Sequence, residues 1–574
     1  MSPSNPQPLI VQANGTILLE TASDPERVVR TSLHRFADLQ KSTDDHLTYV
    51  IHSLSLWHAA AQGAQPAELI RLLQTHAKFG VPQHLQEEIR GSMGRYGKVK
   101  LEKDEADGKL TPHLKLSAEV ETPLDLIRED AELAQYVVQD VHRNELKLQA
   151  DGRGWLKQRL ALKGWPVMDF VGFDEGERLE VAWQSGRACQ ADVVFQIRDY
   201  QKEAIHSFMA HEQLHGGSGV IVLPCGAGKT IVGIGAIEAC QCAALILTTN
   251  QTSVQQWRRE LLEKTTLHPH QVSVYSSEDK QVAPVTIATY QMLTYRRSRD
   301  GAFQHLSLFQ RRDWGLIIYD EVHLLPAPVF RMTAELQAKR RLGLTATLVR
   351  EDSRETDVFS LVGPKKYESG WKPLEKAGFI ARVDCVEYRV LLGDAEEAYL
   401  SASGREQLRM AAVHPSKLEV VRALLKKHQG EQILVMGTYL DQLKRIAHVL
   451  QLPLISGQTS QSVREHYYEQ FKRGEFQHLC VSKVANFAVD LPAASVAIQV
   501  SGSFGSRQEE AQRIGRIMRP KENGQRAMFY TVVTQHTREQ AQARHRQLFM
   551  LEQGYHYTVK HWEGGDSHAR LTAH

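Results

Sequence analysis

Short apolar runs alternate with helical stretches from about residue 195 onward, and this rhythm constrains the fold more than any other feature. The first series is GVIVLP, ALILTT, VTIAT, GLIIYD and RLGLTA, and a second series, QILVMG, PLISG, HLCVSK, SVAIQVS and AMFYTVV, follows residue 430. Such runs are typical of parallel strands that are covered by helices on both faces. We therefore predict an α/β fold with two similar units in tandem.

The residues before about 195 have a different character. Residues 45–91 show helical patterns with Pro66 near one start and Gly80 at one end, as helices are usually punctuated. Strand-like pieces at 98–125 are interrupted by the charged stretch EKDEADGK, and helices at 126–150 and in WLKQRLALKG then mix with strand-like segments such as RLEVAW. We predict a helical module over 1–95 and a small α+β module over 96–190.

Composition excludes several classes of protein. At roughly 150 residues per domain, 574 residues suggest about four domains. Lys and Arg total 69 against 67 Asp and Glu, so there is no global basic field, and nucleic acid would have to be bound in local clefts. No secretory signal begins the chain, and no apolar run approaches the ~18 residues of a membrane helix. We expect no membrane partner, and a disordered tail at 563–574.

The cysteines point to a reducing, cytosolic setting. Six of them in a chain of this length form neither a disulfide framework nor a paired zinc motif. Only Cys240 and Cys242 are closely spaced, and we interpret them as ordinary buried thiols rather than as metal ligands.

A glycine-rich loop joins the first apolar strand to a helix. In such a loop backbone N–H groups approach a triphosphate, the lysine reaches the outer phosphates and the threonine hydroxyl can bind Mg²⁺. Leu223 stands where the usual pattern has its first glycine, but the later glycines supply the tight turn. The predicted nucleotide-binding residues are Pro224, Cys225, Gly226, Ala227, Gly228, Lys229 and Thr230.

Asp320 and Glu321 follow another apolar strand, GLIIYD. Hydrolysis of a nucleotide needs one carboxylate to hold Mg²⁺ and a second to orient or deprotonate the attacking water. We assign these roles to Asp320 and Glu321 in that order, and we interpret His323, in the tetrad Asp-Glu-Val-His, as a functional neighbour.

With GAGKT, DEVH, Thr345-Ala346-Thr347 and EEAQRIGRIMRP in this order, the chain resembles superfamily 2 helicases. More narrowly, it resembles the XPB family of DNA repair helicases. The closer match is carried by LPCGAGKT, LGLTATLVRED, LVGPKKYESGWKPLEKAGFIARV, SRQEEAQRIGRIMRPK and QGYHYTV. It covers about 195 to 560, and the upstream part is more weakly similar to the N-terminal and damage-recognition portions of bacterial XPB proteins.

The resemblance implies two RecA-like domains, at 191–380 and 381–562, with ATP and Mg²⁺ between them. It implies that Gln512, Arg516 and Arg519 act on the phosphates from the second domain, where arginines would neutralise transition-state charge; we expect Arg513 to face water. It also implies that Arg198 and Gln201 bind adenine, beside Tyr200, and that Asp490 belongs to the nucleotide site although KVANFAVD departs from the family's polar pattern. A thumb-like insertion is implied between about 385 and 430.

The resemblance further implies residues that contact DNA or couple it to ATP. Thr248 to Trp257 matches a region that touches the DNA backbone, and Arg350-Glu351-Asp352 matches a motif that we interpret as a wedge for strand separation. The predicted set is Thr248, Trp257, Thr289, His323, Thr345, Thr347, Arg350, Glu351, Asp352 and Thr459.

The function implied is that of an ATP-dependent 3′–5′ DNA helicase or translocase of DNA repair, acting on single-stranded DNA and duplex junctions in the bacterial cytosol or nucleoid. One alternative is a duplex-DNA translocase or ATP-switched scaffold that recruits a nuclease without unwinding. A second is an RNA remodeller, and the least favoured is a nucleotide-binding protein without a nucleic-acid substrate.

Overall fold

The computed structural model groups the chain into two compact units, one of Met1–Pro224 with Gly228–Gly370 and the other of Cys225–Ala227 with Trp371–His574. No helix among the described residues is long and apolar enough to cross a membrane. The structure describes residues 7–24, 28–42, 46–104, 113–184, 188–189, 193–209, 216–298, 303–337, 339–346, 355–482, 494–502, 507–515, 517, 526–553, 555 and 557–563. The predicted division into four domains and a tail stays a prediction, and the tail lies outside the described residues from 564 on.

The first unit begins with an antiparallel sheet in the order β1-β2-β4-β3. Its strands are β1 (Leu9–Val11), β2 (Thr16–Glu20), β3 (Asp38–Ser42) and β4 (His46–Val50), and a short helix α1 (Val28–Leu33) lies between β2 and β3. The helices α2 (Ser53–Ala61), α3 (Pro66–His76) and α4 (Gln83–Arg95) follow. The expectation of a helical module over 1–95 is therefore right only after residue 52, because these short strands alternate buried and half-buried residues over too few positions to stand out.

A second, mostly antiparallel sheet follows in the order β7-β8-β6-β5-β9. Its elements are β5 (Val99–Lys103), β6 (Leu114–Ala118), α5 (Thr122–Glu129), α6 (Ala131–Ala134), β7 (Val137–His142), β8 (Glu145–Leu148), α7 (Arg153–Leu162) and β9 (Val167–Asp169). The helix predicted at 126–150 is wrong after Ala134, where a hairpin begins. RLEVAW forms isolated bridges at Arg178 and Trp183 rather than a strand.

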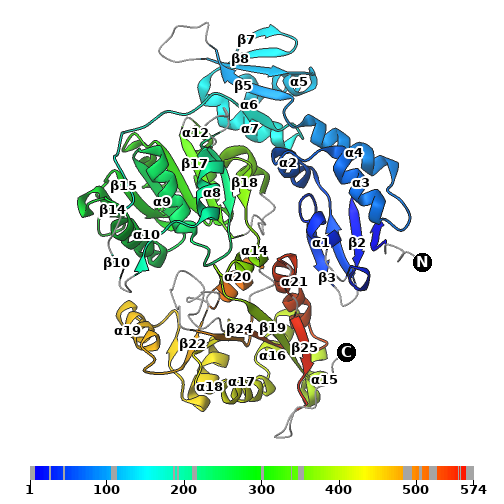
Figure 1. Ribbon diagram of the computed structural model, residues 1–574, viewed down its shortest axis with the longest axis vertical. Helices are drawn as coiled ribbons and strands as arrows, with labels where there is room; N and C mark the ends of the chain where they lie inside the picture. Colours follow the sequence, from blue (N-terminus) through cyan, green and yellow to red (C-terminus); the bar gives the residue numbers. More distant parts are fainter. Residues whose placement is uncertain are drawn as a thin grey trace. The chain divides into compact units, whose positions relative to one another are not determined.

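The first parallel sheet has the order β14-β15-β13-β16-β17-β12-β18; Figure 1 labels β14, β15, β17 and β18 of this sheet. Its strands are β12 (Ser218–Val222), β13 (Ala244–Thr248), β14 (Val272–Tyr275), β15 (Val285–Thr289), β16 (Leu316–Asp320), β17 (Arg340–Thr345) and β18 (Lys365–Glu368), and β10 (Ala188–Cys189) with β11 (Val193–Val194) forms a separate ribbon. The helices are α8 (Asp199–Met209), α9 (Lys229–Cys240), α10 (Gln251–Lys264), α11 (Tyr290–Leu293), α12 (Ala327–Glu335) and α13 (Glu355–Asp357). All five predicted strands are confirmed, while both edge strands were missed.

Buried charges join α7 to this parallel sheet. The Nζ of Lys157 lies 2.8 Å from Asp169 and donates to Gln337 Oε1 at 2.8 Å. The guanidinium groups of Arg153 and Arg341 both lie over the aromatic ring of Phe173, at 5.4 and 5.3 Å from its centre. Every cation here has a hydrogen-bonded partner, as burial of charge requires, so the small module is held to the sheet by specific polar contacts.

The second unit contains another parallel sheet, in the order β21-β22-β20-β23-β24-β19-β25. Its strands are β19 (Val383–Val390), β20 (Ile433–Met436), β21 (Leu454–Ile455), β22 (His478–Val481), β23 (Val496–Gln499), β24 (Ala527–Thr534) and β25 (Tyr557–His561). Its helices are α14 (Trp371–Lys376), α15 (Glu396–Ser401), α16 (Gly404–Ala412), α17 (Ser416–Lys427), α18 (Leu440–Leu450), α19 (Gln461–Lys472), α20 (Arg507–Gly515) and α21 (Arg538–Glu552). The five predicted strands are again confirmed; β19 and β25 were missed.

We expect acid to destabilise the first unit partly through His58. Burial, with Lys365 nearby, lowers the pKa of this half-buried histidine to about 3, and its ring packs edge-on to Phe359 at 5.3 Å. Below pH 6.5 the unfolded chain therefore binds a proton at this ring that the folded chain does not. The free energy of unfolding then decreases as the pH is lowered, by about 1–2 kcal/mol at pH 5. Between pH 7.5 and pH 5 the melting temperature of His58→Phe should decrease less than that of wild type. An equal decrease in both would contradict this account.

Candidate nucleotide-binding and hydrolysis site

Four adjacent strands of the first parallel sheet, β13, β16, β17 and β12, end at one edge and carry the predicted site. Thr248, Asp320 and Thr345 are the last residues of β13, β16 and β17. Thr345 pairs with Val222 at the end of β12, and its carbonyl accepts from the N–H of Leu223 at 3.0 Å. The carboxyl edge of an open parallel sheet is where such folds bind ligands.

The glycine-rich loop after β12 turns directly into α9. Gly226 and Gly228 both have left-handed backbones, with φ of 81° and 80°, which glycine adopts without strain. Lys229 and Thr230, both half-buried, are the first residues of α9, while Pro224 is buried and Cys225 half-buried. The loop thus delivers a helix N-terminus, a lysine and a hydroxyl to one place, a donor set that fits a phosphate chain.

Gln201 lies against this loop. Its side chain is 4% exposed, it accepts from the backbone N–H of Arg198 at 3.1 Å and it donates to the Tyr200 hydroxyl at 3.4 Å. A Cβ added to Gly228 would lie 2.5 Å from its Nε2. The predicted adenine-binding residues Arg198 and Gln201 are therefore next to the predicted phosphate-binding residues.

The two carboxylates of the DEVH tetrad have different partners. The Nζ of Lys229 lies 3.4 Å from Oε1 of Glu321, whereas Asp320 faces β13 and α10. The Nδ1 of His323 lies 2.7 Å from the Thr345 hydroxyl and 3.5 Å from Glu321 Oε2. His323 is 3% exposed, so it links the end of β17 to the glutamate rather than facing solvent.

Glu321 also has a left-handed backbone, with φ of 52°. For a residue other than glycine this conformation costs roughly 1 kcal/mol or more and is found most often at functional sites. It directs the chain from β16 into the short helical turn that carries His323.

Burial and mutual repulsion separate the pKa values of the two carboxyl groups. Burial, reinforced by Glu321, raises the pKa of Asp320 to about 6. Burial would also raise the pKa of Glu321, but Lys229 and His323 outweigh it and hold this pKa below its usual value. A cation beside Asp320 would offset the burial and the repulsion that disfavour its ionised form, which fits the predicted Mg²⁺ ligand.

Asp320 is held by donors from two other segments. Its Oδ2 accepts from the Thr248 hydroxyl at 3.2 Å and from the Trp257 indole N–H at 3.0 Å. Its backbone carbonyl accepts from the Tyr290 hydroxyl at 2.9 Å. Sequence reasoning missed these bonds. A glycine inside a helix often marks a close contact, and Gly233 in α9 was such a signal, because a Cβ there would lie 2.4 Å from the Trp257 ring.

These contacts change the interpretation of three predicted DNA-binding residues. Thr248 and Trp257 are at most 1% exposed and point at Asp320, and Thr289, 6% exposed, caps α11 by accepting from the Met292 N–H at 3.1 Å. In this structure their hydroxyl and indole groups are used internally, and their role in DNA contact or coupling stays a prediction.

The predicted residues of the second unit are only partly described. Gln512 lies in α20, and half-buried Thr459 closes the turn after β21, where its hydroxyl accepts from the Ser456 N–H at 2.9 Å. The expectation that Arg513 faces water is wrong, because it is 1% exposed and donates to Gln499 and to the Ser501 carbonyl. Thr347, Arg350, Glu351, Asp352, Asp490, Arg516 and Arg519 lie outside the described residues.

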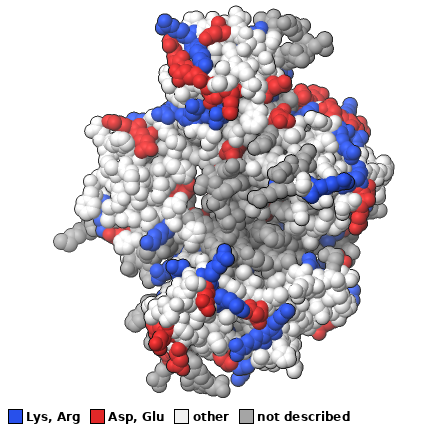
Figure 2. All heavy atoms as spheres, turned by 180° about the vertical axis from the view of Figure 1, so that it is seen from behind, with Lys and Arg blue, Asp and Glu red and all other residues white. Residues whose placement is uncertain are grey.

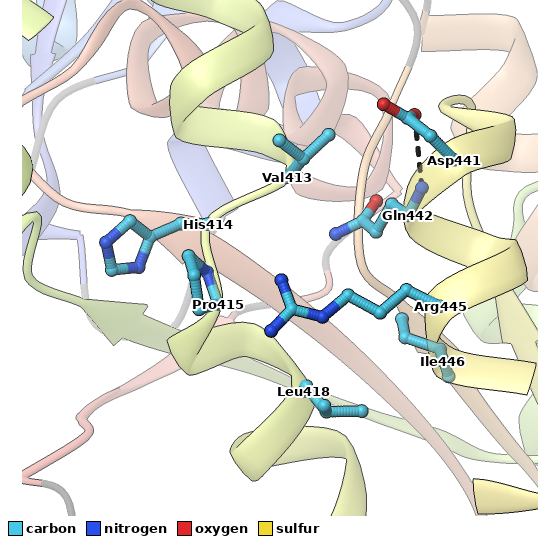
Figure 3. A pocket seen from close by; sticks show the side chains of 8 residues that line it. All are labelled: Val413, His414, Pro415, Leu418, Asp441, Gln442, Arg445 and Ile446. Atoms are coloured by element: carbon cyan, nitrogen blue, oxygen red, sulfur yellow. Dashed lines mark hydrogen bonds between the residues drawn. The ribbon is translucent and has the colours of Figure 1, made fainter. Parts of the chain in front are cut away.

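The region expected to hold a thumb-like insertion contains α15, α16 and α17. A pocket of about 170 Å³ lies between the α16–α17 connection and α18, with Arg445 extending between Pro415 and Leu418 (Figure 3). Sequence reasoning did not find this pocket.

Charge on the surface agrees with the near-zero net charge. Figure 2 shows Lys and Arg side chains mixed with Asp and Glu side chains on the face that it presents. Any grip on a polyanion must then be local, as expected from composition.

Comparison with known proteins gives consistent matches along the chain. Residues 374–571 match the ERCC3/RAD25/XPB C-terminal helicase family, 9–141 a helicase conserved C-terminal domain and 194–350 the type III restriction enzyme res subunit. DNA 3′-5′ helicase XPB of Mycobacterium tuberculosis is 46% identical over 96% of this chain and 97% of its own length. The Kineococcus radiotolerans protein of the same name is 47% identical over 96% of both chains.

A more distant relative extends the match to eukaryotes. The general transcription and DNA repair factor IIH helicase/translocase subunit XPB of Encephalitozoon cuniculi is 33% identical over 96% of this chain and 82% of its own length. Together with the phosphate loop and the DEVH tetrad at one sheet edge, these matches show that the chain belongs to the XPB family of helicases.

Proposed function

We propose that this protein is an ATP-dependent DNA helicase that moves 3′ to 5′ and acts in DNA repair, in the bacterial cytosol or nucleoid where its DNA lies. The observation that carries the proposal is the convergence of Lys229, Asp320, Glu321 and His323 at one sheet edge in a chain 46% identical to a protein named DNA 3′-5′ helicase XPB.

Each residue of the edge has a role in hydrolysis. ATP with Mg²⁺ supplies the phosphoanhydride that is cleaved and a cation that neutralises its charge. Lys229 and the loop N–H groups hold the outer phosphates, and Asp320 with Thr230 offers hard oxygen ligands, which Mg²⁺ prefers. Glu321, kept ionised by Lys229, accepts a proton from the attacking water. Gln201 and Arg198 select adenine beside the loop.

In this proposal the unit that contains the second parallel sheet is the second RecA-like domain of the motor. Arg516 and Arg519 neutralise charge on the transferred phosphate, Gln512 acts beside them as an uncharged hydrogen-bonding group, and Asp490 completes the nucleotide site. Thr459, Thr347 and the Arg350-Glu351-Asp352 motif contact DNA, the last as a wedge at the junction between single strands and duplex. Binding through phosphates should weaken with salt and show little dependence on sequence.

A second candidate function is translocation on duplex DNA, or ATP-switched recruitment of a nuclease, without strand separation. It is favoured by the word translocase in the name of the E. cuniculi relative. Strong stimulation of ATP hydrolysis by duplex DNA without displacement of a labelled strand would support this candidate over unwinding.

DNA-stimulated ATP hydrolysis should depend on the two ends of the Lys229–Glu321 ion pair. Lys229→Ala and Glu321→Gln should each lower turnover by about 100-fold or more, because each removes a charge that acts on the transition state. Lys202→Ala, which removes an exposed lysine of α8, is the control and should match wild type. Unchanged turnover in either site variant would refute the assignment; stimulation by RNA instead of DNA would restore the RNA alternative.

Polarity is tested with tailed duplexes. A duplex with only a 3′ single-stranded tail should be opened in the presence of ATP, and one with only a 5′ tail should remain paired, because a 3′–5′ motor must load on the strand that it tracks. A gel assay with a labelled displaced strand measures this, and preferential opening of the 5′-tailed duplex would contradict the proposed direction.

Selection of adenine should be sensitive to Gly228. In Gly228→Ala the new methyl group meets the Gln201 amide, so the preference for ATP over GTP should fall by about fivefold, the worth of one neutral hydrogen bond. Gly226→Ala imposes the same backbone strain but meets no atom of the described residues within 4 Å, and it should keep the preference. Competition binding with a fluorescent nucleotide measures the preference for ATP over GTP in both variants. An equal loss of this preference in the two would show that Gln201 does not select the base.

A further inference from the structure

Trp257 is the side chain through which three parts of the site touch each other. It lies on α10, is 1% exposed and donates its indole N–H to Asp320 Oδ2 at 3.0 Å. The far edge of its ring packs against the backbone of α9 at Gly233, where an added Cβ would be 2.4 Å from Cη2 and 3.2 Å from Cζ3. One rigid aromatic group therefore spans from the helix that starts with Lys229 to the carboxylate that ends β16.

A second donor to Oδ2 of Asp320 comes from Thr248, at the start of segment 248–257. The hydroxyl of Thr248, at the end of β13, donates to Asp320 Oδ2 at 3.2 Å. Two donors on one oxygen fix the rotation of the carboxylate plane and favour its ionised form, and neither of them uses Oδ1. Oδ1 is thus left as the oxygen that a divalent cation can take.

The segment between these donors begins at the protein surface. Asn250 caps α10 by accepting from the Ser253 N–H at 3.0 Å, and Gln251 is exposed. Val254 and Trp257 are buried on the inner face of the same helix. A shift of the exposed first turn of α10 would therefore move the indole and Asp320 together.

We propose that Trp257 is a positioning residue for the hydrolytic site: with Thr248 it sets the orientation of Asp320 in which that carboxylate binds the divalent cation of the nucleotide. The inference rests on the proposed function for the identity of the cation and the nucleotide. It gives the buried part of segment 248–257 a task within the hydrolytic site, which is to hold the metal ligand in place.

Trp257→Phe removes the N–H while keeping most of the ring, and Thr248→Val removes the other donor at constant shape. Each should weaken Mn²⁺ binding in the presence of a non-hydrolysable ATP analogue by about tenfold, the effect of one hydrogen bond to a charged group. Mn²⁺ binding is measured by electron paramagnetic resonance, which needs no turnover. Thr248→Ser, which restores a hydroxyl, should restore the affinity.

Trp314→Phe is the matched control, because Trp314 is also 1% exposed and donates its indole N–H, but to the Leu308 carbonyl at 3.1 Å. It should lose comparable thermal stability and retain wild-type Mn²⁺ affinity. Gly233→Ala, which presses on the ring, should imitate Trp257→Phe, whereas Gly235→Ala, whose Cβ meets Ile205 at 2.1 Å, should not.

In steady-state hydrolysis the positioning variants should lower kcat and raise the Mg²⁺ concentration needed for half-maximal rate, with the KM for Mg-ATP nearly unchanged. Wild-type Mn²⁺ affinity in both Trp257→Phe and Thr248→Val would overturn the inference, as would equal losses in Trp314→Phe. An absence of DNA-stimulated hydrolysis in wild type would instead refute the proposed function, and the Mn²⁺ titration would still decide the role of Trp257.

Discussion

Two neighbouring half-buried carboxylates at the end of β16 are the constraint on which the rest of the site depends. Burial and repulsion raise the pKa of Asp320 to about 6, whereas Lys229, with His323, holds the pKa of Glu321 below its usual value. The glycine-rich turn starts α9 at the position where Lys229 reaches Glu321. Thr248 and Trp257 donate hydrogen bonds to the Asp320 carboxylate and so offset its loss of water. Charge compensation thus connects the polar residues Thr248 and Asp320, which end β13 and β16, with the lysine that begins α9.

Sequence patterns predicted the central strands of both parallel sheets because these are buried on both faces and read as continuous apolar runs, as in ALILT of β13. Of the missed strands, β14, β18 and β25 lie at sheet edges, and β18 and β25 mix polar with apolar residues over four or five half-buried or exposed positions. The glycine, lysine and acidic motifs located the site because each of them is a short run of neighbouring residues. Partners separated by many residues could not be predicted, as the bond between Trp257 and Asp320 and the burial of Arg513 against Gln499 show.

The small α+β module is attached to the first parallel sheet by charge as well as by apolar packing. Gly154 of α7 comes so close to the Ala334 carbonyl that a Cβ would be 2.1 Å away, and one turn later Lys157 is shared between Asp169 and Gln337. Removal of one member of such a buried set leaves an uncompensated charge, which costs more than the pair contributes. Within this unit, force on the module would be carried directly to α12 and β17, the strand that ends at Thr345.

The left-handed backbone of Glu321 sets stability against activity at one position. Glycine there would relieve the backbone strain, roughly 1 kcal/mol, and would also remove a buried carboxylate. Under the proposed function the chain would also lose the group that accepts the proton, and Lys229 would lose its ionic partner. Selection for thermostability alone would therefore set backbone strain against an ion pair at this position, whereas selection for hydrolysis would act on the carboxylate itself.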